Sequence, residues 1–278
     1  MYFARNSNLI SGFLLSCIIC TGASLSSPAV PASVAPTVTY FDARGRAEVT
    51  RCIFKIAEKE FEDERFPITL KLGADGTPTG FEVLEFEKQK KEGKFKVNMD
   101  RLPTMKIDGI TIGQSPAMER AAATVCGMTG KGFAEQCLID CLCENVRDLK
   151  DSWRDLTIKQ GFKPSPEKTK AKEEWFNKPV SERGGFRQLI SSLNNSLPSL
   201  AAGAADHFAV GDSITLLDVL IWNLLKETFT EQDDFELFDA AMTGNNDMSV
   251  DRLNAIADHI HSLPMIQEWL EKRPLTKM

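Results

Sequence analysis

Tyr40 stands at the end of a short β-branched run, and two arginines around a glycine follow it (Arg44, Gly45, Arg46). The chain has only one other tyrosine, Tyr2. A phenol can donate a hydrogen bond to an anion, and the N-terminus of a following helix adds a favourable partial charge. The connection between the strand and the following helix can therefore hold an anion. The alternative is a core tyrosine beside a surface arginine.

A second polar group opens a helix further along the chain. Ser115 is followed by Pro116, a pairing typical of a helix start with serine as the N-cap and proline at the first position. The free amides of a helix N-terminus bind carboxylates. Gln114 precedes this start and offers a side-chain amide.

The residues around Tyr40 predict a strand that leads directly into a helix. Thr37 to Phe41 alternates β-branched and aromatic residues, which is typical of a strand. The next residues place apolar side chains on one side at helical spacing. These are Val49, Cys52, Ile53, Ile56 and Ala57.

Further short elements follow. We expect a second strand from Asp63 to Leu70, a turn-rich insertion from Gly73 to Gly80 and a helix from Phe81 to Gly93. Two strands then surround Asp108-Gly109 between Leu102 and Gly113, because Asp-Gly is a strong hairpin signal. The order β-α-β-α-β-β-α describes a compact domain with a mixed sheet.

The second half is predicted to be a helical bundle. Residues 133–156 place Leu138, Cys141 or Leu142, Val146, Leu149 and Trp153 on one helical face. Thr215 and Asp218 have the spacing of a capping box, whose role is in folding. The Pro- and Lys-rich segment from Lys163 to Lys172 is interpreted as a surface connector.

The N-terminus differs from the rest of the chain. A single cation, Arg5, precedes an apolar stretch from Leu9 to about Cys20 and a Ser/Pro/Ala-rich spacer, which is typical of a cleaved signal peptide. The stretch is shorter than the roughly 20 residues that cross a bilayer, although an uncleaved signal anchor stays open. We therefore expect a leader in residues 1–35, an α/β domain in 36–128 and a helical domain in 129–278.

Composition narrows the classes of function. The 278 residues are 42% hydrophobic and carry a formal net charge of -6, so we expect a folded chain that does not bind nucleic acid. Five cysteines remain beyond the leader, an odd number, and we interpret them as free thiols. No paired CxxC spacing occurs and the three histidines lie far from the cysteines, so we expect no metal site.

Several of these motifs, in this order, resemble those of sigma-class glutathione transferases, the class that includes haematopoietic prostaglandin D synthase. The similar segments are TYFDARGRAEVTRCIF, RLPTMKIDGITIGQS, EQCLID, GDSITLLD and EWLEKRPLTKM. The resemblance covers about residues 37 to 278. It implies a thioredoxin-like βαβαββα domain followed by an all-α C-terminal domain, which is the glutathione transferase fold.

The resemblance implies roles for the residues of both polar groups. Tyr40 would stabilise the glutathione thiolate with support from Arg46, since a free thiol is only a few per cent ionised at neutral pH. Gln114 and Ser115 would hold the γ-glutamyl part. The main chain of Leu102, before a cis Pro103, would pair with the cysteinyl part.

Three further contacts are implied. Phe86 stands where the family has a tryptophan, and Lys90 follows four residues later, so both would lie near the glycyl carboxylate. Asp148 would reach across a homodimer interface toward the γ-glutamyl ammonium; its alternative is an exposed helix charge. The positive charge of Arg147, which lies between Glu144 and Asp148 in the sequence, disfavours binding of a divalent cation at this interface.

The implied function is conjugation of glutathione, as cosubstrate, to apolar electrophiles or reduction of organic peroxides. The alternatives are a glutathione-dependent isomerase of the prostaglandin D synthase type and a non-catalytic binding or structural relative. A mechanism based on Cys52 is a lesser alternative, because this residue lies too far along the helix to replace Tyr40. The leader indicates a secretory route or a complex plastid; without it the chain would be cytoplasmic.

Overall fold

The computed structural model describes residues 35–74, 76–157, 165–200, 203, 205–243, 248–274 and 276. The predicted leader lies outside these residues except for its last position, so it stays a prediction. In the part of the chain that is described, no helix combines the length and the apolar character that crossing a bilayer requires.

Four strands form the central sheet, in the order β2-β1-β5-β6. β1 (Thr37–Phe41) pairs in parallel with β2 (Glu62–Phe66) and antiparallel with β5 (Thr104–Ile107), and β5 pairs antiparallel with β6 (Ile110–Gly113). The predicted hairpin is confirmed. Its turn residues Asp108 and Gly109 both have positive φ, 47° and 78°, as a tight two-residue hairpin turn requires.

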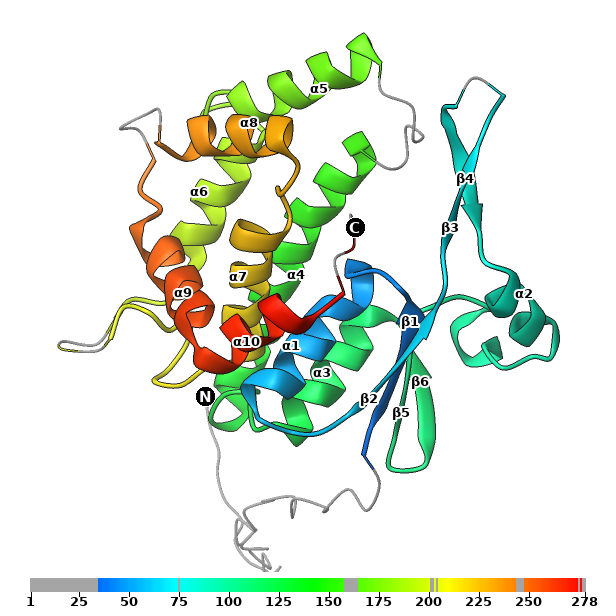
Figure 1. Ribbon diagram of the computed structural model, residues 1–278. Helices are drawn as coiled ribbons and strands as arrows, with labels where there is room; N and C mark the ends of the chain where they lie inside the picture. Colours follow the sequence, from blue (N-terminus) through cyan, green and yellow to red (C-terminus); the bar gives the residue numbers. More distant parts are fainter. Residues whose placement is uncertain are drawn as a thin grey trace, which may run out of the picture. The chain divides into compact units, whose positions relative to one another are not determined.

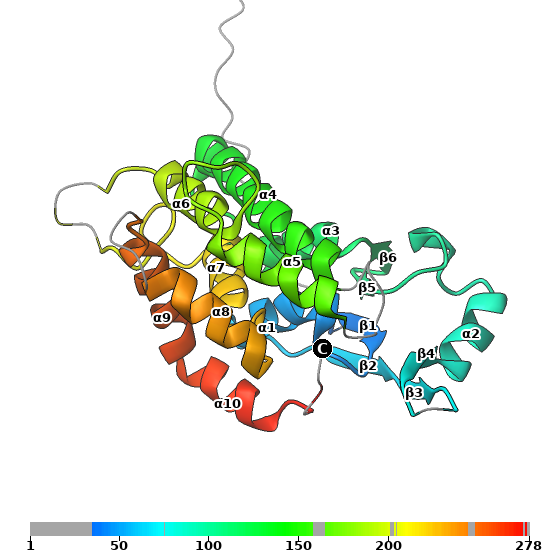
Figure 2. The ribbon, with the colours of Figure 1, turned by 90° about the horizontal axis from the view of Figure 1, so that it is seen from above.

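Two helices lie on the same side of this sheet in both ribbon views (Figures 1 and 2). They are α1 (Glu48–Ile56), which follows a short 3-10 turn (Gly45–Ala47), and α3 (Ser115–Val125). The apolar face predicted for α1 is buried except for Ala57, which is half-buried. α1 also contacts α7 and α10 of the helical half, so it joins the sheet domain to the helices.

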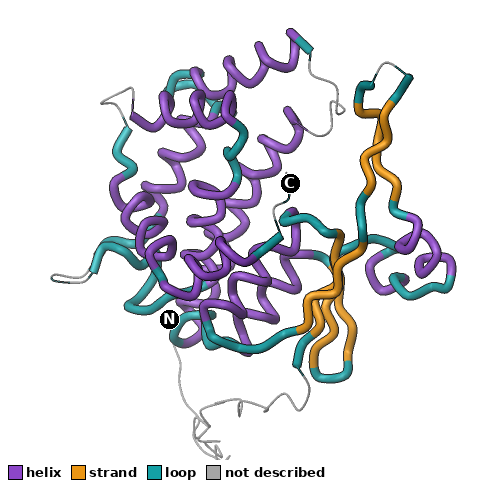
Figure 3. Tube along the Cα trace, in the orientation of Figure 1, coloured by secondary structure: helices purple, strands orange, loops and turns teal. Residues whose placement is uncertain are grey.

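The strand predicted from Asp63 to Leu70 is wrong in extent. β2 ends at Phe66, and a separate hairpin of β3 (Thr69–Leu72) and β4 (Pro78–Glu82) follows (Figure 3). Pro67 interrupts the run because it has no amide hydrogen for a strand ladder. The predicted insertion therefore supplies the turn and most of β4, and the predicted helix begins only with α2 (Leu84–Lys91).

Seven helices of the described residues make up the second half. They are α4 (Gly132–Thr157), α5 (Pro166–Asn177), α6 (Phe186–Ser196), α7 (Leu216–Glu227), α8 (Gln232–Thr243), α9 (Asp251–Ser262) and α10 (Pro264–Lys272). Residues 216–225 of α7 are all buried, and α7 contacts α1, α4 and α9. On α4, Leu142 is buried and Cys141 is exposed, which resolves the open alternative for that face.

Two local predictions about helix starts have different outcomes. The capping box of α7 is confirmed: the backbone N–H of Thr215 donates to the Asp218 carboxylate at 2.8 Å. The surface connector is wrong in its second half, because α5 begins at Pro166. The Ser165 side chain caps that helix by accepting a hydrogen bond from the Lys168 backbone at 3.2 Å, so Ser-Pro is a start signal here as well.

Candidate functional site

A pocket of about 200 Å³ lies between three segments. These are the connection from β1 to α1, the turn before β5 and the start of α3. It brings together five of the residues predicted from the sequence, which are Arg46, Leu102, Pro103, Gln114 and Ser115. Asn98 and Arg101 complete its lining. Arg46 from the first polar group and Gln114 and Ser115 from the second therefore line one pocket, whereas Tyr40 is not among its lining residues.

Tyr40 lies beside this pocket. It is half-buried near the end of β1, and its hydroxyl lies against the backbone of Gly45. A Cβ atom on Gly45 would lie only 2.8 Å from the Tyr40 hydroxyl oxygen. Because Arg46 follows Gly45 directly and lines the pocket, the phenol and the pocket are neighbours.

Asn98 organises the opposite wall. Its side-chain Nδ2 donates to the carbonyl oxygens of Pro103 at 2.8 Å and Arg101 at 3.1 Å, and its Oδ1 accepts from the Gln114 backbone N–H at 3.2 Å. Its side chain is buried, and the Leu102-Pro103 bond is cis. Asn98 was missed from the sequence; the available signal was an asparagine, which favours such short-range bonds to the backbone, just before the Leu-Pro pair.

The start of α3 differs by one residue from the prediction. Ser115 is the first residue of the helix, and Gln114, with φ 64°, occupies the N-cap position without a side-chain capping bond. The prediction of Ser115 as N-cap is therefore wrong. Ser115 is buried at the pocket, where the partial positive charge of the helix N-terminus favours a carboxylate.

Cations dominate the surroundings of this helix start. Arg46 and Arg101 line the pocket, and both are exposed. Lys150 of α4 donates a hydrogen bond to Asn223. Burial lowers the pKa of Lys150, Glu119 opposes this effect, and the positive charges of Arg147 and, to a smaller extent, Arg46 add to it. The two arginines that line the pocket favour a bound anion.

The carboxylate of Glu119 is already engaged. Arg147 forms an ion pair with it and with Glu144. Burial raises the pKa of Glu119, and Arg147 opposes this rise.

The described residues hold no group of three or more side chains that could bind a metal ion.

Phe86, Lys90 and Asp148 do not line this pocket. Phe86 is buried in an aromatic cluster, with its ring stacked on that of Phe95 at 5.3 Å between centroids. Lys90 lies over the Phe86 ring and pairs with Glu87 at 3.6 Å. Asp148 is exposed on α4. Their contacts with glutathione stay predictions, since the first two lie on α2 and the third requires a second subunit.

The buried thiols are unsuited to nucleophilic chemistry. Burial raises the pKa of Cys52 well above its ordinary value, and the negative charge of Glu48 adds to this effect. Because only the thiolate is a good nucleophile, the alternative mechanism based on Cys52 has no support in this environment.

Comparisons with known proteins agree with the fold. The model of the family "Glutathione S-transferase, C-terminal domain" matches residues 153–273. The chain is 27% identical over 241 residues to probable glutathione S-transferase 9 of Caenorhabditis elegans, covering 85% of this chain and 96% of that protein. It is 28% identical over 240 residues to hematopoietic prostaglandin D synthase of Gallus gallus, covering 86% and 96%.

Solved structures show the same fold. A monomeric glutathione S-transferase of the hookworm Necator americanus matches with a TM-score of 0.63 and 24% identity, over 88% of this chain and 100% of the other. A prostaglandin synthase D of Nilaparvata lugens matches with a TM-score of 0.60 and 20% identity, over 87% and 100%. With its thioredoxin-like sheet domain and its helical domain, the chain has the glutathione S-transferase fold, and it resembles nematode glutathione S-transferases and haematopoietic prostaglandin D synthases in sequence.

Proposed function

We propose that this chain activates glutathione and conjugates it to apolar electrophiles, with reduction of organic peroxides as a related activity. Tyr40 donates its phenolic hydrogen to the glutathione sulfur and stabilises the thiolate. The thiol of a free cysteine side chain ionises near pH 8.5 and is mostly protonated at neutral pH. One hydrogen bond to an anion, worth roughly 1.5–3 kcal/mol, lowers such a pKa by about one to two units.

The observation that carries this proposal is the convergence of the pocket residues beside Tyr40. Ser115 and the N-terminus of α3 suit the γ-glutamyl carboxylate, and the main chain of Leu102 suits the cysteinyl part. Arg46 and Arg101 supply cations for an anionic tripeptide. A structural protein would not require this combination.

Two further parts of the proposal concern α2 and α4. Phe86 and Lys90 would bind the glycyl carboxylate, and Asp148 would reach the glutathione of a second subunit in a homodimer. The similar hookworm protein is described as monomeric, so the oligomeric state needs its own test. Light scattering after gel filtration is expected to give twice the chain mass, and a single-chain mass would remove the role of Asp148.

The main experiment compares the wild type with Tyr40→Phe. We expect both proteins to be retained on immobilised glutathione, and we expect Tyr40→Phe to lose about 10- to 100-fold in kcat/KM with a generic aromatic electrophile. In the full chain, with the leader retained, Tyr2→Phe removes the only other tyrosine hydroxyl and is the matched control. Equal turnover by wild type and Tyr40→Phe would remove the role of Tyr40.

The same assay separates the alternatives. Retention on glutathione without turnover by the wild type would favour a binding or structural protein. The related prostaglandin D synthases raise the alternative of an isomerase, which would convert its substrate without consuming glutathione.

We also propose that the leader is removed and directs the chain to a secretory route or a complex plastid. The apolar stretch from Leu9 to Cys20 and the small residues after it support this. N-terminal sequencing of the mature protein tests it. A mature chain that begins at Met1 would favour a signal anchor or a cytoplasmic protein.

A further inference from the structure

The turn that carries Arg44 and Gly45 sets the position of the Tyr40 hydroxyl. Gly45 has φ 42°, and the space for its Cβ is occupied by Tyr40: the phenolic oxygen and the Cε1 ring atom both lie 2.8 Å from that position. The phenol therefore rests directly on the backbone of this turn. A shift of the turn would change the direction in which the hydroxyl points.

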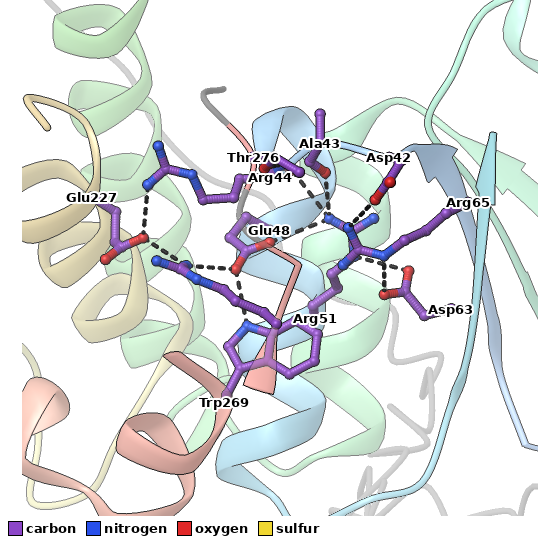
Figure 4. A network of polar contacts seen from close by, with 11 residues as sticks. Asp42, Ala43, Arg44, Glu48, Arg51, Asp63, Arg65, Glu227, Trp269 and Thr276 are labelled. Carbon is purple, nitrogen blue, oxygen red and sulfur yellow. Dashed lines mark hydrogen bonds and ion pairs between the residues drawn. The ribbon is translucent and has the colours of Figure 1, made fainter. Parts of the chain in front are cut away.

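This turn is attached to the C-terminal end of the chain. The backbone N–H of Arg44 donates to Thr276 Oγ1 at 3.1 Å. The Arg44 guanidinium donates to Glu227 at 3.3 Å and to Thr230 at 3.2 Å. Figure 4 shows Arg44, Thr276 and Glu227 side by side, although more than 180 residues separate Arg44 from the other two.

Arg273 connects this end of the chain to the two halves of the protein. Its Nη1 lies 2.8 Å from Glu48 of α1 and 2.7 Å from Glu227 of α7. Trp269 donates to the same Glu48 carboxylate at 2.9 Å. The side chains of Glu48 and Glu227 are only 3% and 8% exposed, so these charge-assisted bonds are shielded from water.

The charges of this network support one another. Burial alone would lower the pKa of Arg273, but the hydrogen bonds and negative charges of Glu227 and Glu48 outweigh burial and raise it. Glu48 also accepts from the fully buried Arg51 at 3.2 Å, and Arg51 donates to the carbonyl oxygen of Ala43 at 2.8 Å. Arg51 of α1 thus holds Ala43 at the start of the turn. Thr276, near the C-terminus, holds Arg44 in the middle of the turn.

We propose that Arg273 and Thr276, here called the C-terminal clamp, are positioning residues that hold the Arg44–Gly45 turn so that the Tyr40 hydroxyl points at the glutathione sulfur. The proposal rests on the thiolate-stabilising role proposed for Tyr40. Neither Arg273 nor Thr276 is among the residues that line the pocket. Loss of the clamp should therefore weaken thiol ionisation more than glutathione binding.

The test uses the full chain and two clamp variants. Thr276→Val removes the acceptor of the Arg44 N–H and keeps the side-chain shape. Arg273→Gln removes the cation shared by Glu48 and Glu227. The matched control is Lys272→Gln, which removes the neighbouring cation of α10, whose pairing with Glu268 lies on the surface.

Three measurements are made on each protein: the pKa of the bound glutathione thiol from thiolate absorbance against pH, the glutathione KM with kcat, and the fluorine spectrum of fluorotyrosine-labelled protein. Because the chain has two tyrosines, Tyr40→Phe assigns the Tyr40 signal. We expect Thr276→Val to raise the bound-thiol pKa by about one unit, a tenfold loss of ionisation. We expect kcat to fall, KM to stay within about twofold and the Tyr40 signal to shift or broaden; the control should match the wild type.

The outcomes separate the clamp from the function on which it rests. If the wild type and Thr276→Val lower the pKa of the bound thiol equally, the clamp is overturned and the role of Tyr40 stays intact. A wild type that does not lower the thiol pKa would overturn both. A variant in which only the glutathione KM rises, while kcat and the bound-thiol pKa stay unchanged, would also overturn the clamp. Thr276→Val decides the question even where Arg273→Gln fails to fold, because it changes one half-buried hydroxyl.

Discussion

Gly45 leaves no room for a side chain beside the Tyr40 hydroxyl, so Gly45→Ala should impair catalysis. At φ 42° an alanine is strained by roughly 1–2 kcal/mol. Its Cβ would also lie 2.8 Å from the phenolic oxygen. An ordinary contact to a carbon atom begins near 3.4 Å, so the phenol would have to withdraw by about 0.6 Å.

A displacement of this size is comparable with the tolerance of a catalytic hydrogen bond. Misplacement by about 1 Å can reduce a rate about 100-fold, and a hydrogen bond to a charged group is worth roughly 1.5–3 kcal/mol. We therefore expect Gly45→Ala to lose about 10- to 100-fold in kcat/KM. Its free energy of unfolding should fall by only about 1–2 kcal/mol.

Gly109→Ala is the matched control for this substitution. Gly109 also has positive φ, 78°, but no atom lies within 4 Å of its Cβ position, so the variant should have similar strain and retain activity. The assays are urea unfolding and kcat/KM with a generic electrophile at several glutathione concentrations. Full activity in Gly45→Ala, or an equal loss in Gly109→Ala, would refute the argument from the Tyr40 contact.

Three further predictions follow from burial and hydrogen bonding. Asn98→Ala should destabilise the protein by about 1–3 kcal/mol and raise the glutathione KM, as measured by urea unfolding and kinetics; an unchanged KM would separate Asn98 from the site. Under native conditions an alkylating reagent should modify the exposed Cys137 and leave Cys52 unmodified, because burial raises the Cys52 pKa; peptide mapping by mass spectrometry would reveal native labelling of Cys52 as the contrary result. Arg147→Gln should cost about 3–5 kcal/mol at pH 7, since it removes the ion-pair partner of the buried Glu119 carboxylate. Burial already raises the folded-state pKa of Glu119, and loss of the cation should raise it further, so the deficit should shrink as the pH falls toward about 5 and Glu119 binds a proton; equal deficits at both pH values would argue against this cause.

Local sequence patterns predicted most of the elements near the site. Helical spacing identified the buried face of α1, and Asp108-Gly109 identified the hairpin between β5 and β6. These signals act over a few residues, where backbone geometry and side-chain periodicity decide the structure. The same reasoning failed at Pro67, because the segment predicted as one strand continues across this proline, whereas β2 ends before it.

The candidate site could be predicted only in part. Arg46, Ser115 and Leu102 were expected from their types and from the resemblance, and they line one pocket. Asn98 was missed because its partners are backbone groups of the loop before β5 and of the residue before α3, which no spacing rule connects. Phe86 and Lys90 were assigned through a loose correspondence, and the structure places them on α2 outside the pocket.

The sequence alone therefore specified a tyrosine at the end of a strand, an arginine-flanked glycine and a helix start suited to carboxylates. Three contacts are determined only by the tertiary structure. Tyr40 packs against Gly45, Asn98 connects the walls of the pocket, and Thr276 holds the turn from the C-terminal end of the chain. The physical reason is the range of the forces involved. Periodicity and capping act within one or two turns of a helix, whereas the direction of the Tyr40 hydroxyl depends on buried ion pairs such as that of Arg273 with Glu48, which form only when distant segments pack together.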